Sequence, residues 1–366
     1  MTRGIAAAIA ALTVFWMSTP APAAEEAWIE PRCSKLPFEK LGPFVHLSDG
    51  SILCLQGNTA SATADGGQTW SEPKPLYDGP PPGVPGNSVA VRTRSGAIVV
   101  VFADRSTFQW RWDDAQRAPA DDVNLDVWSI RSLDDGKTWT DRQMILEGYC
   151  GALIDMIQTR TGRIAVPVQD LFRNPGRHEI RPYYSDDDGK TWHSDQFIDL
   201  GGHGHHDGAM EPTLAELGDG RVWMLIRTNW DCFWEAFSED QGRFWRTVRP
   251  SRIDASSAPG HLLRLKSGRL ALAWNRLYPE GKTDIARSKN IQASEAAASW
   301  HRQELSLAFS EDDGTTWCPP AVIARRAGGG LSYPYLFEPA AGELWVFTRF
   351  SHHLGLKLKE TDVAGR

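Results

Sequence analysis

Residues that can move protons and residues that can hold an anion occupy equivalent positions in this sequence. Nine residues before a recurring turn glycine stand Glu211 in one segment and Tyr333 in another. Seven residues after the same glycines stand Arg227 and Arg349, and Arg302 precedes a second repeated motif. A carboxylate and a phenol can exchange protons with a reacting group, and a planar guanidinium can bind two carboxylate oxygens at once. These residue types indicate a site for an acidic ligand.

The positions are defined by an internal repeat, which decides the architecture. A small residue followed by glycine lies between two apolar runs, and this pattern predicts a hairpin because glycine accepts a positive φ. The turn glycine occurs six times, at Gly50, Gly96, Gly162, Gly220, Gly268 and Gly342. The predicted strands that follow these turns are 52–55, 98–102, 164–168, 222–226, 270–274 and 344–347.

A second motif, S/T-x-D-x-G-x-T-W, is called the Asp box below. It occurs at 63–70, 132–139, 185–192 and 310–317, and at 238–245 with Phe244 in place of the threonine. Its aspartate can hydrogen-bond the turn backbone, and its tryptophan can pack between neighbouring sheets. We therefore interpret the boxes as structural, and we do not assign their aspartates to an active site.

Six such units predict an all-β fold, a six-bladed β-propeller of four-stranded antiparallel blades, with residues 24–366 as a single domain. We expect residues near Glu25 to Cys33 to pair with the last blade and remove its open edge. The glycine hairpins join strands 1 and 2 and the boxes join strands 3 and 4, so both lie on one face. The sequence then places Glu211, Arg227, Arg302 and Tyr333 at the centre of the opposite face, where loops on a rigid scaffold build sites.

The amino terminus predicts export. Residues 1–23 contain an early Arg3, an apolar stretch over 5–17 and a small-residue cleavage site over 21–23, as in a secretory signal peptide. No segment is long and apolar enough to span a bilayer, so we expect a secreted or periplasmic monomer. A formal charge of -7 without a basic run argues against a nucleic-acid partner. The five cysteines lack a metal-binding spacing, and we expect no metal or cofactor.

The repeats and the matched positions resemble the sialidase (neuraminidase) family over nearly the whole mature chain. The resemblance rests on Glu211 in Glu-Pro-Thr-Leu, Arg227 in Leu-Ile-Arg-Thr, Arg302 in Arg-Gln-Glu-Leu-Ser-Leu-Ala-Phe-Ser and Tyr333 in Ser-Tyr-Pro-Tyr-Leu. It implies an exo-acting glycoside hydrolase that removes a terminal acidic sugar, sialic acid or a relative, from a glycan or glycoconjugate. Tyr333 would be the nucleophile and Glu211 its base, because the sugar carboxylate would repel a carboxylate nucleophile. Arg227 and Arg302 would hold that carboxylate.

Two parts of the family pattern are absent. The family's first arginine lies in an Arg-Ile-Pro near the start of blade one, where this chain has Lys40-Leu41-Gly42. Lys40 keeps the charge without the two-pronged guanidinium, and Arg349 is a second candidate for the missing group. The family's acid/base aspartate lies on a blade-one loop that here spans 56–61 and holds no acid. The best replacement source is the long blade-two loop over 104–124, from whose aspartates, Asp113, Asp114, Asp121 and Asp122, we select Asp121 and Asp122.

A histidine-rich segment over 201–207 precedes Glu211 on the same face. It is either a flexible polar loop or a source of sugar contacts and proton transfer, with His206 as the candidate, because histidine titrates near neutrality. Two other functions stay open. One is a hydrolase or lyase for another acidic glycan that uses a histidine or a blade-two aspartate, and the other is a non-catalytic sugar-binding propeller.

Overall fold

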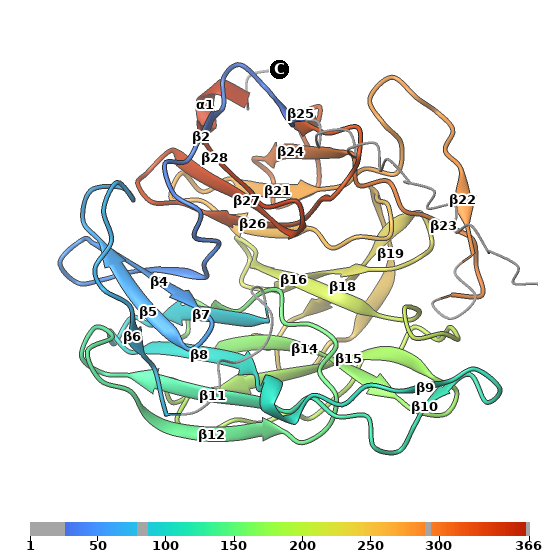
Figure 1. Ribbon diagram of the computed structural model, residues 1–366, viewed down its shortest axis with the longest axis horizontal. Helices are drawn as coiled ribbons and strands as arrows, with labels where there is room; N and C mark the ends of the chain where they lie inside the picture. The colour runs from blue at the N-terminus through green and yellow to red at the C-terminus, as the bar shows by residue number, and fades with distance from the viewer. Residues whose placement is uncertain (1–25, 79–86, 290–293, 364–366) are drawn as a thin grey trace, which may run out of the picture.

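The computed structural model describes residues 26–78, 87–289 and 294–363, and these residues form a ring of β-sheets (Figure 1). The six-bladed β-propeller predicted from the repeats is confirmed. Helix is confined to η1 (Arg105–Thr107) and α1 (Glu360–Val363) within the described part of the chain. None of the described helices has the length and apolar character needed to cross a membrane. The predicted signal segment lies outside the described residues.

The blades follow one another along the chain, each with its first strand nearest the axis. Blade 1 consists of β3 (Phe44–His46), β4 (Ile52–Gln56), β5 (Thr59–Thr63) and β6 (Lys74–Pro75). Blade 2 consists of β7 (Ser88–Arg92), β8 (Ile98–Ala103), β11 (Val127–Ser132) and β12 (Thr140–Leu146). Blade 3 consists of β13 (Ile157–Gln158), β14 (Ile164–Phe172) and β15 (Arg177–Ser185), and single bridges to Ile198 and His193 mark its outer strand.

Blade 4 consists of β16 (Met210–Glu216), β17 (Val222–Arg227), β18 (Cys232–Ser238) and β19 (Thr247–Asp254). Blade 5 consists of β20 (His261–Arg264), β21 (Leu270–Trp274), β24 (Glu304–Ser310) and β25 (Ala321–Arg325), and blade 6 of β26 (Leu331–Phe337), β27 (Glu343–Ser351) and β28 (Leu354–Lys359). Two hairpins project from the loops, β9 (Trp112–Asp113) with β10 (Ala118–Pro119) and β22 (Arg287–Ser288) with β23 (Ala298–Ser299).

The amino-terminal segment closes the ring. Strand β2 (Ser34–Lys35) pairs with β28 and supplies the outer strand of blade 6. This strand begins just after the predicted segment from Glu25 to Cys33, and within that segment β1 (Trp28–Ile29) pairs with β25 of blade 5 instead of the last blade. The first and last parts of the described chain are therefore joined, and the edge of blade 6 is covered.

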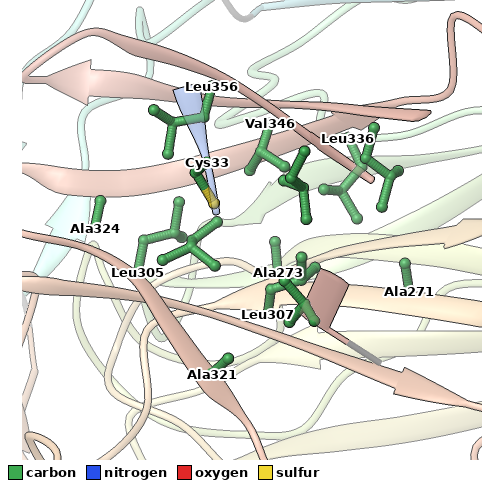
Figure 2. Close-up of a cluster of buried hydrophobic side chains, with 14 of the residues drawn as sticks. Cys33, Ala271, Ala273, Leu305, Leu307, Ala321, Ala324, Leu336, Val346 and Leu356 are labelled. Atoms are coloured by element: carbon green, nitrogen blue, oxygen red, sulfur yellow. The ribbon is translucent and has the colours of Figure 1, made fainter. Parts of the chain in front are cut away.

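The hydrophobic core is divided among the interfaces between blades. Figure 2 shows the cluster between blades 5 and 6, where Leu305 and Leu307 meet Leu336 and Val346 beside the buried Cys33. Five comparable clusters fill the other interfaces between neighbouring blades. Each sheet buries apolar area only against its neighbours, so the ring must close for the terminal blades to be stable.

The Asp boxes stabilise their own turns. In the box of blade 2, Asp134 accepts hydrogen bonds from the Thr138 amide and hydroxyl at 2.8 and 2.7 Å. The residue that follows the box aspartate contacts the glycine hairpin of the preceding blade. In blade 3 this residue is Asp188, and it accepts a hydrogen bond from Ser95 Oγ in the blade-2 hairpin at 2.7 Å. Hairpins and boxes therefore share one face, and the structural interpretation of the boxes is confirmed.

Candidate active site

Three of the predicted residues form one hydrogen-bonded cluster although 122 residues separate the first from the last. The Tyr333 hydroxyl donates to Glu211 Oε1 at 2.5 Å. Arg227 Nη1 lies 2.5 Å from the other Glu211 oxygen and 3.3 Å from the Tyr333 hydroxyl. The fourth residue, Arg302, has its guanidinium carbon 5.5 Å from the centre of the Tyr333 ring. We call Glu211, Arg227, Arg302 and Tyr333 the central cluster.

The backbone is strained at two members of the central cluster. Glu211 has a φ of 45° and Tyr333 a φ of 57°, and each precedes a proline. A left-handed conformation at such residues costs roughly 1–3 kcal/mol each and persists only where the surroundings enforce it. Between blades 3 and 4 the Glu211 amide donates to the Gln169 side chain at 2.9 Å, and the β16–β17 register shifts between Met210 and Thr213. The strain aims a carboxylate and a phenol from different blades at one point.

All three guanidinium nitrogens of Arg227 make hydrogen bonds within the protein. The residue is 1% exposed, and its Nε and Nη2 donate to Ser257 Oγ at 3.3 and 3.0 Å. Ser257 Oγ in turn donates to Asn229 Oδ1 at 2.6 Å. The Arg227 charge therefore balances the buried Glu211 carboxylate and lies beside the Tyr333 oxygen. Burial and the nearby Glu211 raise the pKa of Tyr333 to about 12, so the phenol is protonated in the free protein.

Arg302 is the less enclosed of the two arginines. Its Nη2 donates to the Ser257 carbonyl at 2.8 Å, whereas its Nε has no hydrogen-bond acceptor among the described residues. Burial, followed by the charge of Arg227, lowers the pKa of Arg302. Both effects make a bound anion favourable, because an anion supplies an acceptor and offsets a desolvated positive charge. Phe350 stacks on Tyr333 at 5.0 Å and completes this side of the site.

The histidine segment lies beside the central cluster and is anchored by hydrogen bonds. The Nδ1 atoms of His205 and His206 contact each other, and Asn229 donates to the His206 carbonyl at 2.6 Å. The buried His178 ring holds the His205 carbonyl at 2.7 Å. Burial and then the charge of Arg227 lower the pKa of His206 to about 2, so its imidazole is neutral near pH 7. The described residues contain no group of three or more side chains that could hold a metal.

The structure places the other predicted site residues elsewhere. Asp121 and Asp122 are exposed, and Asp122 pairs with Arg111 at 2.9 Å. The Lys40 ammonium lies over the ring of Trp70, the Asp-box tryptophan of blade 1, at 5.0 Å. None of these three makes a described hydrogen bond or ion pair with the central cluster.

Arg349 shares the strand register of Arg227 but lies at the propeller axis. Its Nε donates to the Leu41 carbonyl at 3.0 Å, and its guanidinium lies 3.7 Å from the Tyr335 ring centre. There it lines an axial cavity of about 600 Å³, whose wall also includes the buried Asp155 and His261. The register fixes the position of a residue along its strand. The direction of a long side chain depends on the residues that surround it.

Sequence reasoning missed the residues that hold the central cluster in place. Ser257 and Asn229 lie in loops that have no repeat register, so no sequence signal marked them. Gln169 was detectable in principle, because it lies seven residues after the turn glycine of blade 3, the position that Arg227 occupies in blade 4. A polar side chain at this position of the second strand is therefore a useful signal in each blade.

Known proteins share this architecture. Residues 58–346 match the family described as BNR repeat-like domain. A sialidase of Micromonospora viridifaciens is 25% identical over 308 residues, which cover 76% of this chain and 44% of that protein. The chain thus spans less than half the length of this relative.

Solved structures show the same fold. A Hadza microbial sialidase superposes with a TM-score of 0.60 at 18% identity and covers 88% of this chain and 65% of its own. The NanB sialidase of Streptococcus pneumoniae superposes with a TM-score of 0.59 at 14% identity, covering 90% and 71%.

Proposed function

Because this chain belongs to the family of BNR repeat-like domains, we propose that it is an exported glycoside hydrolase of the sialidase type that removes a terminal acidic sugar. The observation that carries the proposal is the 2.5 Å hydrogen bond between Tyr333 and Glu211 with two arginines beside it. A buried carboxylate bonded to a partly buried phenol, both on strained backbone, is the arrangement that a tyrosine nucleophile needs.

The chemistry proceeds through a covalent intermediate. Tyr333 attacks the anomeric carbon while Glu211 accepts the phenol proton, and the bond from that carbon to the leaving oxygen breaks. Water then attacks the anomeric carbon of the glycosyl-tyrosine and gives one proton to the group that had protonated the leaving oxygen. The bond to the Tyr333 oxygen breaks, and the phenol recovers its proton from Glu211. Two displacements give net retention. Arg227 Nη1, 3.3 Å from the hydroxyl, stabilises the negative charge that develops on the phenol oxygen.

The two arginines divide the work in this proposal. Arg302 receives the sugar carboxylate, since it is partly exposed and keeps an unpaired N–H. Arg227 is buried against Glu211 and Tyr333 and serves the nucleophile. This assignment refines the expectation that both arginines bind the carboxylate.

Protonation of the leaving oxygen falls to a group outside the central cluster. Asp121, Asp122 and His206 are the candidates; His206 is affected by the charges of Arg227 and Arg302 and, being neutral in the free protein, would have to take up a proton when the acidic sugar binds. Replacing them singly with Asn, Asn and Gln identifies the acid as the residue whose loss slows a poor leaving group far more than an activated one.

The paired histidines also favour one second candidate function. The contact between His205 and His206 beside the arginines suits a hydrolase or lyase of a different acidic glycan in which a neutral imidazole accepts a proton.

A substrate panel tests the proposal directly. The purified chain is incubated with aryl glycosides of sialic acid, related 2-keto acids, uronic acids and neutral hexoses, and the first-formed anomer is read by NMR. We expect turnover of the anomeric carboxylates alone, with retained configuration. An unsaturated product would favour the lyase, and binding without turnover would favour a sugar-binding propeller.

A further inference from the structure

The axial cavity runs along the propeller axis from beneath the central cluster toward the opposite face. Its inner end is lined by residues that follow the site on their strands or reach the axis beside it, namely Asp155, His261, Tyr335 and Arg349. Its outer end is lined by exposed residues at or beside the hairpin turns, namely Arg160, Gly218 and Gly268. The cavity therefore opens on the face of the Asp boxes, opposite the central cluster.

The wall between these two ends is mainly apolar. It is contributed by the first strands of four blades through Val89, Val91, Ile157, Leu214 and Leu262. From Leu214 to Gly218 the lining extends about 13 Å along the strand direction. A volume of about 600 Å³ is typical of a small-molecule site. These dimensions suit an unbranched alkyl chain of about ten carbons, at roughly 1.3 Å per carbon.

Arg349 brings a poorly compensated positive charge to the inner end. Among the described residues it makes one hydrogen bond, from Nε to the Leu41 carbonyl at 3.0 Å, and its buried Nη2 has no acceptor. Burial lowers the pKa of Arg349 to about 10, although the charge of Asp155 acts in the opposite direction. Arg227, in contrast, is paired with Glu211 at 2.5 Å. A desolvated guanidinium without such a partner favours a bound anion.

His261 supplies a second donor at the same end. The Leu336 amide donates to His261 Nδ1 at 3.4 Å, so the proton of the neutral ring lies on Nε2. That nitrogen is buried without an acceptor in the described part of the chain, and Asp155 Oδ1 lies 3.9 Å away. Asp155 is engaged elsewhere, since its Oδ2 accepts from the Thr213 hydroxyl and the Leu214 amide at 2.7 and 2.8 Å. Two unpartnered buried donors are unfavourable unless a ligand supplies their acceptors.

We propose that the axial cavity is a second ligand site, which binds a single-chain fatty acid of medium length. The carboxylate accepts hydrogen bonds from Arg349 and His261, and the alkyl chain lies along the apolar wall toward the hairpin face. Only the Nε of Arg349 is held by a hydrogen bond, so small changes of its torsions bring the outer nitrogens to the ligand. The site lies outside the central cluster, and the inference does not depend on the proposed function.

Calorimetric titration of the purified chain with sodium decanoate tests the proposal, with 1-decanol and hexanoate as comparison ligands. We expect one decanoate per chain and an affinity at least about tenfold higher than for 1-decanol, which lacks the charge. Hexanoate should bind far more weakly, because each methylene removed from water contributes about two- to fourfold in affinity. Equal affinities for decanoate and 1-decanol, or no decanoate binding, would overturn the proposal.

A pair of arginine variants locates the carboxylate. Arg349→Met should weaken decanoate binding about tenfold or more without lowering the melting temperature of the ligand-free protein, because it removes a desolvated charge. Arg302→Met, at the central cluster, is the matched control and should keep the wild-type affinity for decanoate. The reverse pattern would place the carboxylate at the central cluster and overturn the axial site. A lower melting temperature in Arg349→Met with decanoate affinity unchanged would show that Arg349 has only a structural role.

Two further variants test the cavity without changing Arg349. Val91→Phe narrows the cavity and should weaken decanoate binding more than hexanoate binding, because the longer chain reaches farther along the wall. Asp155→Asn removes the carboxylate beside His261 and should strengthen decanoate binding several-fold. Unchanged decanoate affinity in both variants would overturn the proposal.

Discussion

The two faces of this propeller use polar side chains in opposite ways. In an Asp box, the aspartate bonds a threonine four residues away, and the carboxylate is solvent-accessible. At the central cluster, the hydrogen bonds join residues 106 and 122 positions apart, and the Glu211 and Arg227 side chains are 7% and 1% exposed. One arrangement is local and repeated, while the other is long-range and occurs once. The repeated turns stabilise a frame that can enforce strain at the centre.

The two faces should also respond differently to substitution. Removing one box weakens one turn, since the other boxes are independent. Removing one partner of a buried ion pair leaves an uncompensated charge, which typically costs about 3–5 kcal/mol. We therefore expect changes at the centre to affect turnover strongly and changes in the boxes to affect only stability.

The largest effect is expected from Tyr333→Phe. Loss of the attacking oxygen should reduce turnover of an activated aryl glycoside by roughly 10³-fold or more, while loss of its hydrogen bond to Glu211 should lower the melting temperature by only a few degrees. Steady-state kinetics and calorimetry measure the two quantities. The control is Tyr335→Phe in the same strand, which removes the oxygen that accepts from the Phe44 amide and should cost stability without comparable loss of turnover. Wild-type turnover in Tyr333→Phe would exclude a tyrosine nucleophile.

The two arginines should give different kinetic signatures. Arg302→Lys loses the two-pronged contact and should raise KM for an acidic glycoside about 10- to 100-fold with a smaller change in kcat. Arg227→Gln leaves Glu211 without its charge partner and should lower kcat and the melting temperature together. Identical KM effects in both variants would contradict the division of work.

As the pH falls, two buried histidines should lose their contribution to the stability of the fold before the Asp boxes do. Burial lowers the pKa of His178 and His261 to about 4, so the unfolded chain binds these protons first as the pH falls below about 6.5. Their contribution to stability is complete above about 6.5 and is lost toward pH 4, by up to about 1.4 kcal/mol per pH unit for each. In Asp65 and Asp134, threonine hydrogen bonds lower the pKa to about 2, so the box contribution is lost only below the ordinary aspartate pKa of 3.8.

Urea unfolding between pH 7.5 and 5 measures this slope. His178→Asn and His261→Asn should each reduce this slope by at most about 1.4 kcal/mol per pH unit, the value for one proton. Asp134→Asn should leave the slope unchanged. A slope that responds to the box variant and not to the histidine variants would reverse the assignment.

The smallest effect is expected from a single box. Asp134→Ala removes the acceptor for Thr138 and should lower the melting temperature by a few degrees with kcat/KM unchanged. The matched substitution is Asp121→Ala on the same face as the site, which holds no turn and should leave the melting temperature unchanged. A large loss of turnover in Asp134→Ala would show that the boxes are coupled to the centre.

The sequence by itself determined the frame and the four residues of the central cluster. Turn glycines and Asp boxes act within a few residues, so their spacing reveals the hairpins, the blade count and the face on which strands begin. Glu211 and Tyr333 could be placed because both stand at the same distance from a turn glycine, and Arg227 because it ends the neighbouring strand. Local chemistry is readable whenever the contact partner is close in the chain.

Only the tertiary structure decided how side chains are shared among blades. Arg349 has the register of Arg227, yet Leu41, from the segment that leads into blade 1, and Tyr335, from the neighbouring strand of blade 6, hold it at the axis. Trp110 and Trp112 lie in a loop without periodicity, and contacts with His205 place them beside the site. Spacing fixes the position of a Cα along its strand, whereas the direction of a long side chain and the pairing of its charge depend on residues from other blades, which meet only when the ring closes.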